Sequence, residues 1–442
     1  MKIEDMILVS VDDHIVEPPE MFEQHVPSRF KSQAPRYIVD ERQDGAWHFE
    51  DRQVANVGLN AVVGRPREEY GVEPTAISQM REGAYNVHRR IDDMNVNGLL
   101  GSLNFGTFVG FDGSFFAASK DKNLAHVMVQ AYNDWHIDEW CGAYPGRFIP
   151  MAILPVWNVN LVVEEVKRVV AKGCHAVSFS DNPNLKGLPS IHNGVWEPFW
   201  KVCADNQVVI NCHIGTGAAA AHASMESPID AWITGMPMSI ANSASDWLQL
   251  RALQRYPSLK IALSEGGIGW IPYFLERADF TFEHHHKWTH TDFGGRKPSD
   301  IFREHFLTCF IDDRFGVKSR NDIGIDIICY ECDYPHSDTV WPEAPEYLMR
   351  GFGGCSDEEI DKITHRNAMH AYGFDPFAHA RREDCTVGAL RARAHHVDTA
   401  VRPAAGNRPI EAGETRIVTS GDVVKLFMKA GRPPRELAKE SA

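Results

Sequence analysis

The sequence predicts an α/β protein with a (β/α)8 TIM-like barrel, long insertions and a C-terminal extension. Short apolar runs of strand length alternate with helical segments, and eight such runs match the strand number of a closed parallel barrel. No Gly-rich phosphate loop follows an early strand, which disfavours the alternative of an open doubly wound sheet. The predicted strands are residues 6–11, 98–103, 148–154, 176–180, 207–213, 259–264, 306–311 and 325–330.

The segments between these runs set the expected domain organisation. Residues 18–82 are rich in Pro, Arg and Gly without clear periodicity, so we expect a long irregular insertion of the kind that often serves as a lid. The barrel is expected to span residues 1–377, and residues 378–442 to form an extension that packs on the barrel or on a neighbouring subunit. Helices are predicted at 84–96, 121–143, 161–171, 196–205, 241–255, 271–285 and 357–371.

Composition excludes several classes of protein. Of the 442 residues, 43% are apolar and 24% are charged, which is ordinary for a globular chain. The net charge of −15 argues against nucleic-acid binding, which needs a basic surface. No apolar run approaches the ~18 residues of a membrane span, and the start of the chain does not resemble a signal peptide. Nine scattered cysteines favour free thiols in the cytoplasm, and the insertions and tail favour a homo-oligomer.

Metal-binding residue types follow four of the predicted strands. Asp12 and His14 come after the first strand, two residues apart, so both side chains point to one face. His213 ends the fifth strand, Glu265 follows the sixth and Asp333 follows the eighth. Catalytic groups of such barrels gather at these strand ends.

Each of these residues also has an ordinary structural explanation. His213 suits a core histidine, Glu265 a helix cap and Asp333 a turn. Together, however, two imidazoles and three carboxylates at one rim would repel and desolvate one another without a cation. The sequence therefore predicts a divalent metal bound by Asp12, His14, His213, Glu265 and Asp333.

The order of these residues resembles the amidohydrolase superfamily. The closest likeness is to the branch of aminocarboxymuconate-semialdehyde decarboxylase and related hydroxybenzoate decarboxylases, over about residues 6–375. The resemblance implies an amidohydrolase-type barrel that depends on a metal. Further stretches that carry it are 131–140, 144–148, 187–190, 264–277 and 333–341.

Two departures from the family pattern bear on the reaction. The family usually has His or Glu two residues before the histidine of the first strand, where this chain has Asp12. The decarboxylases carry a histidine after the sixth strand that assists proton transfer, and Glu265 takes that place here. A glutamate is a poor proton donor at neutral pH unless its pKa is raised.

The carboxylate-rich ligand set leads us to expect two irons. With Glu17 as an outer member, it resembles carboxylate-bridged di-iron sites, and the chain is similar in kind to the amidohydrolase-like oxygenase of the platensimycin and platencin pathways. We therefore expect an O2-dependent non-haem di-iron monooxygenase that hydroxylates a bulky apolar, terpenoid-like substrate. One alternative is a zinc or manganese hydrolase of an ester, lactone, amide or thioester, with Glu265 or Asp333 as base. The other is a non-oxidative decarboxylase.

The remaining candidates surround these ligands. Glu265, Asp333 and His336 are the expected catalytic residues. Arg89 and Arg90 are expected to pair with nearby acids rather than with substrate. Residues expected to support the site or contact substrate are Glu17, Phe105, Phe108, His285, Asp338 and Trp341.

Overall fold

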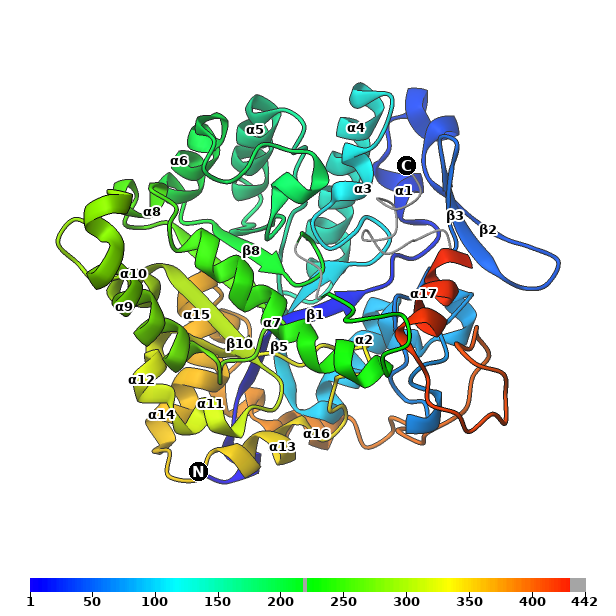
Figure 1. The fold of residues 1–442 in the computed structure, drawn as a ribbon. Helices are drawn as coiled ribbons and strands as arrows, with labels where there is room; N and C mark the ends of the chain where they lie inside the picture. Colours follow the sequence, from blue (N-terminus) through cyan, green and yellow to red (C-terminus); the bar gives the residue numbers. More distant parts are fainter. Residues whose placement is uncertain (218–220, 430–442) are drawn as a thin grey trace.

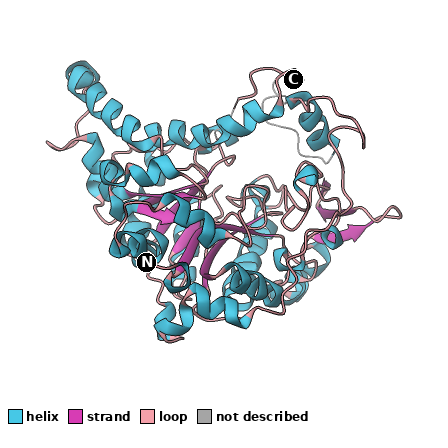
Figure 2. Ribbon diagram, turned by 90° about the horizontal axis from the view of Figure 1, so that it is seen from below, coloured by secondary structure: helices cyan, strands magenta, loops and turns pink. Residues whose placement is uncertain are grey.

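Eight parallel strands form one barrel in the computed structural model, which describes residues 1–217 and 221–429. The sheet order is β6-β5-β1-β11-β10-β9-β8-β7, and a bridge between Ala152 and Val177 closes the ring. Helices surround the strands (Figures 1 and 2), which confirms the predicted fold class. The barrel strands are β1 Leu8–Ile15, β5 Leu99–Gly106, β6 Phe148–Ile149, β7 Ala176–Ser178, β8 Val209–His213, β9 Lys260–Ser264, β10 Phe306–Phe310 and β11 Ile328–Tyr330.

The first strand is longer than the sequence predicts. Its apolar run ends at Val11, but β1 continues to Ile15 because β5 pairs with it as far as Ile15 and Gly106. Asp12 and His14 therefore lie on the strand itself rather than beyond its end. Alternation along the strand still places both side chains on one face.

The predicted helices are present, with differences in their bounds and regularity, and further helices such as α10 and α13 were not predicted. Helix α7 begins at Ile229, well before residue 241, because Gly235 and Pro237 mask the helical pattern without ending the helix. The helix predicted at 121–143 continues from α4 as a π-helix, and the one predicted at 357–371 is also interrupted by a π-helical turn. The helices are α1 Met21–His25, α2 Val87–Asn97, α3 Ser114–Ala117, α4 Lys122–Asp134, α5 Val159–Val170, α6 Glu197–Asp205, α7 Ile229–Trp247, α8 Ala252–Arg255, α9 Ile271–Thr289, α10 Pro298–His305, α11 Arg314–Lys318, α12 Arg320–Ile323, α13 Ala344–Gly351, α14 Asp357–Asp361, α15 Asn367–Tyr372, α16 Val387–Arg393 and α17 Ser420–Lys429.

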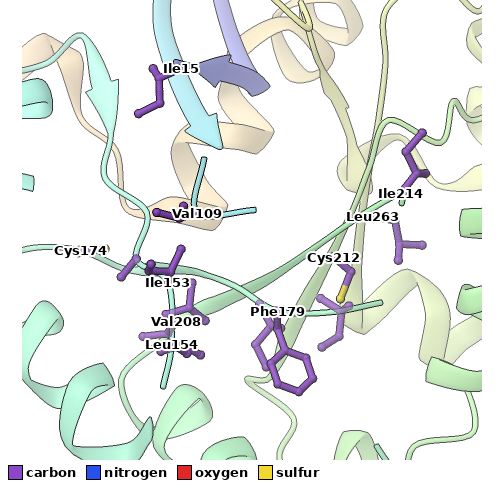
Figure 3. Close-up of a cluster of buried hydrophobic side chains, with 14 of the residues drawn as sticks. Ile15, Val109, Ile153, Leu154, Cys174, Phe179, Val208, Cys212, Ile214 and Leu263 are labelled. Atoms are coloured by element: carbon purple, nitrogen blue, oxygen red, sulfur yellow. The ribbon is translucent and has the colours of Figure 1, made fainter. Parts of the chain in front are cut away.

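The core has two layers because each strand is buried on both faces. One cluster fills the space between the strands and the helices and includes Ile153, Phe179 and Leu263 (Figure 3). The other includes Val9 and Val209, which alternate along their strands with residues of the first cluster. Burial on both faces explains why the strands read as continuous apolar runs.

The segment at residues 18–82 is more ordered than predicted. It contains an antiparallel sheet of β2 Arg36–Val39, β3 Gly45–Phe49 and β4 Arg52–Val54, at the edge of the molecule (Figure 1). The hairpin between β2 and β3 is closed by Asp40, whose carboxylate accepts hydrogen bonds from two backbone amides of the turn. These strands have only three to five residues, and β2 and β4 are partly exposed, so they produce no clear periodic sequence signal.

The C-terminal extension contacts the barrel along its described length. The amide of Val387 donates to the carbonyl of Met6, and Arg391 forms an ion pair with Glu346 of α13. Farther on, the amide of Ile229 at the start of α7 donates to the carbonyl of Val418. Among the described residues, no helix has the length and apolarity to cross a bilayer.

Candidate metal centre

Strand β1 supplies two of the candidate ligands. Asp12 and His14 are fully buried and point to one side of the strand. Asp13 between them points to the other side, where it accepts hydrogen bonds from the Ser102 hydroxyl and, at 3.0 Å, from the amide of Tyr334. Asp13 therefore fastens the loop after β11 to the strand that carries the ligands.

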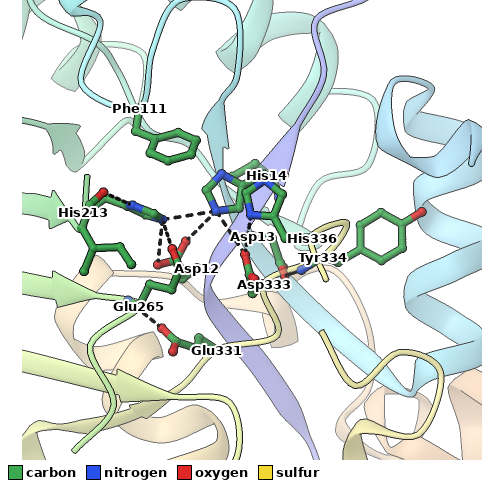
Figure 4. A network of polar contacts seen from close by, with 12 residues as sticks. Asp12, Asp13, His14, Phe111, His213, Glu265, Glu331, Asp333, Tyr334 and His336 are labelled. Atoms are coloured by element: carbon green, nitrogen blue, oxygen red, sulfur yellow. Dashed lines mark hydrogen bonds and ion pairs between the residues drawn. The ribbon is translucent and has the colours of Figure 1, made fainter. Parts of the chain in front are cut away.

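His213, at the end of β8, faces His14 across the site. Its Nδ1 donates to the carbonyl of Ile214 at 2.7 Å, so Nε2 carries the lone pair of the neutral ring. That Nε2 lies 3.2 Å from Nε2 of His14 (Figure 4). Two imidazole nitrogens pointing at one spot from two strands are suited to share a cation there.

Three carboxylates surround the two imidazoles. Oδ1 of Asp333 and Oδ1 of Asp12 lie 3.3 Å and 3.5 Å from Nε2 of His14. Oε2 of Glu265 lies 3.1 Å from Nε2 of His213, and Oδ2 of Asp12 lies 3.6 Å from it. Glu265 and Asp333 both have positive φ, 59° and 54°, an unfavourable backbone conformation that aims their side chains at the site.

The buried oxygens of this cluster fit a divalent cation. Neither carboxylate oxygen of Asp12 or Asp333 has a hydrogen-bond donor of good geometry among the described residues. Burial, followed by the charges of Glu331, Glu265 and Asp333, raises the pKa of Asp12 well above its ordinary value. A bound cation would act as the missing partner of these buried oxygens. Its positive charge would also offset the repulsion among the carboxylates.

Glu331 is a member of the cluster that the sequence analysis missed. It is buried directly after β11, where it accepts a hydrogen bond from the amide of Glu265 at 3.0 Å and another from Sγ of Cys309 at 2.6 Å. Burial, together with the charge of Glu265, raises the pKa of Glu331 to about 8. Its position two residues before Asp333, on the same face of an extended chain, is the signal that would have revealed it.

His336 lies beside the predicted ligands. Its Nδ1 is 2.8 Å from Oδ1 of Asp333, and its ring centroid is 3.9 Å from that of His14. Its Nε2 is buried without a hydrogen-bond partner among the described residues. Burial lowers the pKa of His336, but the negative charge of Asp333 close to Nδ1 outweighs burial and raises it.

The donors form three overlapping groups in the described part of the chain. Each group brings three ligand atoms within 4.8 Å of one another. The groups share His14 or Asp12, so one ion or two neighbouring ions fit the same set of side chains. They are Asp12–His14–His213, His14–Asp333–His336 and Asp12–Cys309–Glu331.

Two phenylalanines form the apolar wall of the site. The ring of Phe111 lies 4.3 Å from His213 and 4.7 Å from His14, measured between centroids (Figure 4). Phe105, a predicted substrate contact, lies 4.9 Å from His213 and 5.8 Å from His14. Both rings shield the imidazoles from water, and Phe111 is the closer of the two.

Two further predicted residues, Phe108 and Glu17, lie close to each other. Phe108 packs against Trp47, with centroids 4.6 Å apart, and its expected role at the site stays a prediction. Glu17 accepts a hydrogen bond from the amide of Phe108 at 2.7 Å and, like Glu265, is in none of the three donor groups, so its assignment as an outer member of the site stays a prediction. The sequence alone does not show that a backbone amide donates a hydrogen bond to this carboxylate.

Two further predictions concern residues around the cluster. His285 lies exposed on α9, where Trp288 donates to its Nδ1, and it is in none of the three donor groups among the described residues. Arg89 pairs with Glu82 and Asp92, as expected.

Arg90 departs from its expected pairing with acids. It is buried and donates to the carbonyls of His14 and Gly83, so it holds the backbone of a candidate ligand from behind.

A cavity of about 720 Å³ opens onto Glu265 and Glu331. Asp338 and Trp341, two of the predicted substrate contacts, line it. Burial, followed by the charges of Asp333 and Glu265, raises the pKa of Asp338 to about 6. The volume suits a drug-sized organic molecule. Other apolar lining residues are Ile214, Ile233, Met236, Trp270, Phe310 and Val340.

Solved structures share this fold. An amidohydrolase from Mycobacterium avium subsp. paratuberculosis is 20% identical with a TM-score of 0.65, covering 83% of this chain and 99% of its own. The 5-carboxyvanillate decarboxylase from Sphingomonas paucimobilis is 16% identical with a TM-score of 0.59, covering 84% and 99%. The 5-carboxyvanillate decarboxylase from Novosphingobium aromaticivorans, whose crystal structure holds manganese, is 17% identical with a TM-score of 0.57 and the same coverage.

A sequence model of the amidohydrolase family matches residues 91–374, which is more than half of the chain. That region includes β8, β9 and β11 with the ligand candidates His213, Glu265 and Asp333. The barrel, the buried donor groups and this match lead to one conclusion. The chain belongs to the amidohydrolase family and is a metal-dependent enzyme of that superfamily.

Proposed function

We propose that this enzyme is a non-oxidative decarboxylase that releases CO2 from an aromatic carboxylic acid and uses one divalent ion. The observation that carries the proposal is His336, a buried imidazole beside His14 with Nδ1 on Asp333 and Nε2 unpartnered among the described residues. Support also comes from two of the structurally similar proteins, which are named as 5-carboxyvanillate decarboxylases, one of them with manganese. Manganese is therefore our first choice of metal, ahead of zinc and iron.

The proposed reaction exchanges CO2 for a proton at one ring carbon. Asp12, His14, His213 and Asp333 would hold the ion, which would supply Lewis-acid polarisation of substrate oxygens. His336 would hold the incoming proton on Nε2, with Asp333 stabilising the imidazolium through Nδ1. As the proton reaches the ring carbon, the bond to the carboxylate breaks, its electron pair stays with the ring, and CO2 leaves.

Glu265 is a poor proton donor at neutral pH, so a decarboxylase needs another residue to supply the proton. The family's histidine after the sixth strand is absent, but the loop after β11 offers His336 as a proton donor for the same region. Phe111 and Phe105 keep water from the imidazoles, which favours protonation by a side chain over solvent. The aromatic and aliphatic cavity wall suits the ring of the substrate.

The test is CO2 release under anaerobic conditions by protein loaded with Mn²⁺, using a panel of hydroxylated benzoic acids. We expect CO2 without O2 consumption, and a loss of about 100-fold or more in kcat for His336→Gln with full metal content retained, since general acids contribute at least that much. His88→Gln, on the exposed side of α2, is the matched control and should keep full activity. CO2 release that is unaffected by His336→Gln would contradict the assigned role. Turnover of esters or lactones alone would favour the hydrolase.

A di-iron oxygenase remains the second candidate because of one observation. The group His14–Asp333–His336 adjoins Asp12–His14–His213 and offers a second metal position in which His336 would be a ligand. Metal analysis of protein purified without added metal separates the two functions. Two irons per chain with substrate-dependent O2 uptake would favour the oxygenase, whereas one ion per chain and no O2 uptake would exclude it.

A further inference from the structure

A buried arginine, Arg90, contacts three segments behind the metal centre. The residue is only 1% exposed. Its Nε donates at 2.6 Å to the carbonyl of Gly83, before α2, and its Nη2 donates to the carbonyl of His14 on β1. The guanidinium carbon lies 4.3 Å from the centre of the Tyr334 ring, in the loop after β11. Because a buried charge is costly unless it is hydrogen-bonded, these contacts hold the guanidinium and the three segments together.

Two of these segments carry candidate ligands. His14 is itself one, and Tyr334 directly follows Asp333. The amide of His14 donates to the carbonyl of Tyr334 at 2.7 Å, so β1 and the loop are joined at this point. Arg90 contacts both residues of that bond, through the carbonyl of one and the ring of the other. It thereby limits the movement of His14 relative to Asp333, whose Oδ1 lies 3.3 Å from Nε2 of His14.

The ring of Tyr334 is held at its far end as well. It points away from the donor cluster (Figure 4), and its hydroxyl donates to Oδ2 of Asp93 at 2.5 Å. Arg81 donates to both oxygens of the same carboxylate, at 2.8 Å and 2.6 Å, and this two-point contact fixes the carboxylate plane. Gly83 packs so closely that a Cβ there would lie 2.5 Å from the hydroxyl oxygen of Tyr334. We call Arg90, Tyr334, Asp93 and Arg81 the clamp.

The C-terminal extension forms the outer end of the clamp. Nη2 of Arg81 also donates to the carbonyl of Asp398 at 2.9 Å. A continuous series of hydrogen bonds thus leads from the extension through Arg81 and Asp93 to the residue after Asp333. The extension contributes no donor to the three groups found in the described part of the chain, but it supports the loop that bears one of the candidate ligands.

We propose that Arg90 and Tyr334 are positioning residues, which hold His14 and Asp333 at the separation that Mn²⁺ requires and so set the selectivity of the metal centre. Divalent ions bind an unconstrained site in an order that places Mn²⁺ below Zn²⁺, so a preference for Mn²⁺ must come from fixed geometry. Groups that orient metal ligands commonly change metal affinity by about 10- to 100-fold. This role rests on the manganese of the proposed function and is independent of the reaction assigned to it.

The test uses two conservative variants of the full-length protein, stripped of metal. Tyr334→Phe removes only the hydroxyl that reaches Asp93, and Arg90→Lys keeps the charge but cannot donate to two carbonyls and stack at once. Dissociation constants are measured for Mn²⁺ by electron paramagnetic resonance of the free ion and for Zn²⁺ by competition with a chelator. We expect the Mn²⁺ constant to rise about tenfold or more and the Zn²⁺ constant to rise less, so that the ratio of the two constants rises. The resonance spectrum of bound Mn²⁺ should also broaden.

Arg147→Lys is the matched control. Arg147 also donates through Nε and Nη2 to two backbone carbonyls, those of Leu100 and Leu99, but at the start of β5. The candidate ligands lie at or beyond the opposite ends of the parallel strands, so this variant should lower the Tm of the metal-free protein without changing the ratio of the Mn²⁺ and Zn²⁺ constants.

Two results would overturn the role of the clamp. One is an unchanged ratio of the Mn²⁺ and Zn²⁺ constants in both variants, and the other is a ratio that rises as far in Arg147→Lys. Tyr334→Phe decides alone if Arg90→Lys does not fold. A wild type that binds Zn²⁺ but no Mn²⁺ would overturn the choice of manganese, and Zn²⁺ constants unchanged in both variants would then overturn the clamp as well.

Discussion

At the scale of single residues, buried histidines differ in the charged groups that lie against them. His213 and His336 lie against carboxylates, which favour the charged ring, whereas His365 lies against arginines. His365 is fully buried, with Arg382 donating towards its Nε2 at 3.4 Å. Burial, followed by the charges of Arg382 and Arg366, lowers the pKa of His365 from 6.5 to about 3.

His365 should therefore contribute to acid unfolding. Its folded pKa is below its unfolded value, so the folded state binds fewer protons and its contribution, on the order of a few kcal/mol, is complete above pH 6.5. That contribution is lost as the pH falls from 6.5 towards 3. We expect His365→Gln to unfold with a shallower fall in Tm over this range, measured by calorimetry in metal-free buffer. Parallel curves for the two proteins would contradict the assigned pKa.

Single residues also show where sequence reasoning reached its limit. Asp12, His14, His213, Glu265 and Asp333 converge in the structure, because the strand ends of a barrel meet at one rim. Their role as metal ligands is still a prediction. Glu331 was missed, since its importance depends on what the fold places next to it.

At the scale of elements, the turn after β9 illustrates how the cavity is shaped. Gly266 follows Glu265, and a Cβ at this position would clash with Cγ2 of Ile240 on α7. The missing side chain lets α7 approach the barrel so closely that Ile233 and Met236 reach the cavity. A larger residue must push the helix outward.

Gly266→Ala should thus destabilise the protein by about 1–3 kcal/mol, the usual cost of overpacking. The change is measured as a shift in the urea midpoint. Ile240→Ala in the same chain removes the clashing methyl groups, and the double variant should be more stable than the sum of the two single losses predicts. Strict additivity would show that the contact does not limit the packing of α7.

Elements also differ in how well sequence predicted them. The eight barrel strands were found because burial on both faces makes them apolar throughout. Strands β2–β4 and the first half of α7 were not, because they are partly exposed or contain Gly and Pro. Elements were predicted where burial on both faces makes the sequence apolar throughout. They were missed where local hydrogen bonds, rather than an apolar pattern, determine the backbone structure.

At the scale of the whole molecule, the carboxylate cluster opposes folding unless a cation is present. Removal of the metal by a chelator should lower Tm, and excess Mn²⁺ should restore it. At a thousandfold excess of Mn²⁺ over the dissociation constant, the free energy of unfolding should rise by about 4 kcal/mol. Asp12→Asn should raise the Tm of the metal-free protein, since it removes one of the mutually repelling charges. It should also abolish the response to Mn²⁺. If the metal-free Asp12→Asn variant is less stable than the metal-free wild type, this account is wrong.

The hydrogen bonding between neighbouring strands is not uniform around the barrel. Between β6 and β7 the ring is closed at Ala152 alone among the described residues, by hydrogen bonds of 3.0 Å to Ala176 and 2.9 Å from Ser178. The strands bearing candidate ligands, β1, β11, β9 and β8, belong to one continuous arc of the sheet in which only β10 intervenes. Transient opening should begin between β6 and β7, where backbone amide hydrogens would exchange with solvent soonest, while the strands of the arc stay paired. The protein can thus open locally between β6 and β7 while the groups that would hold its metal stay in place.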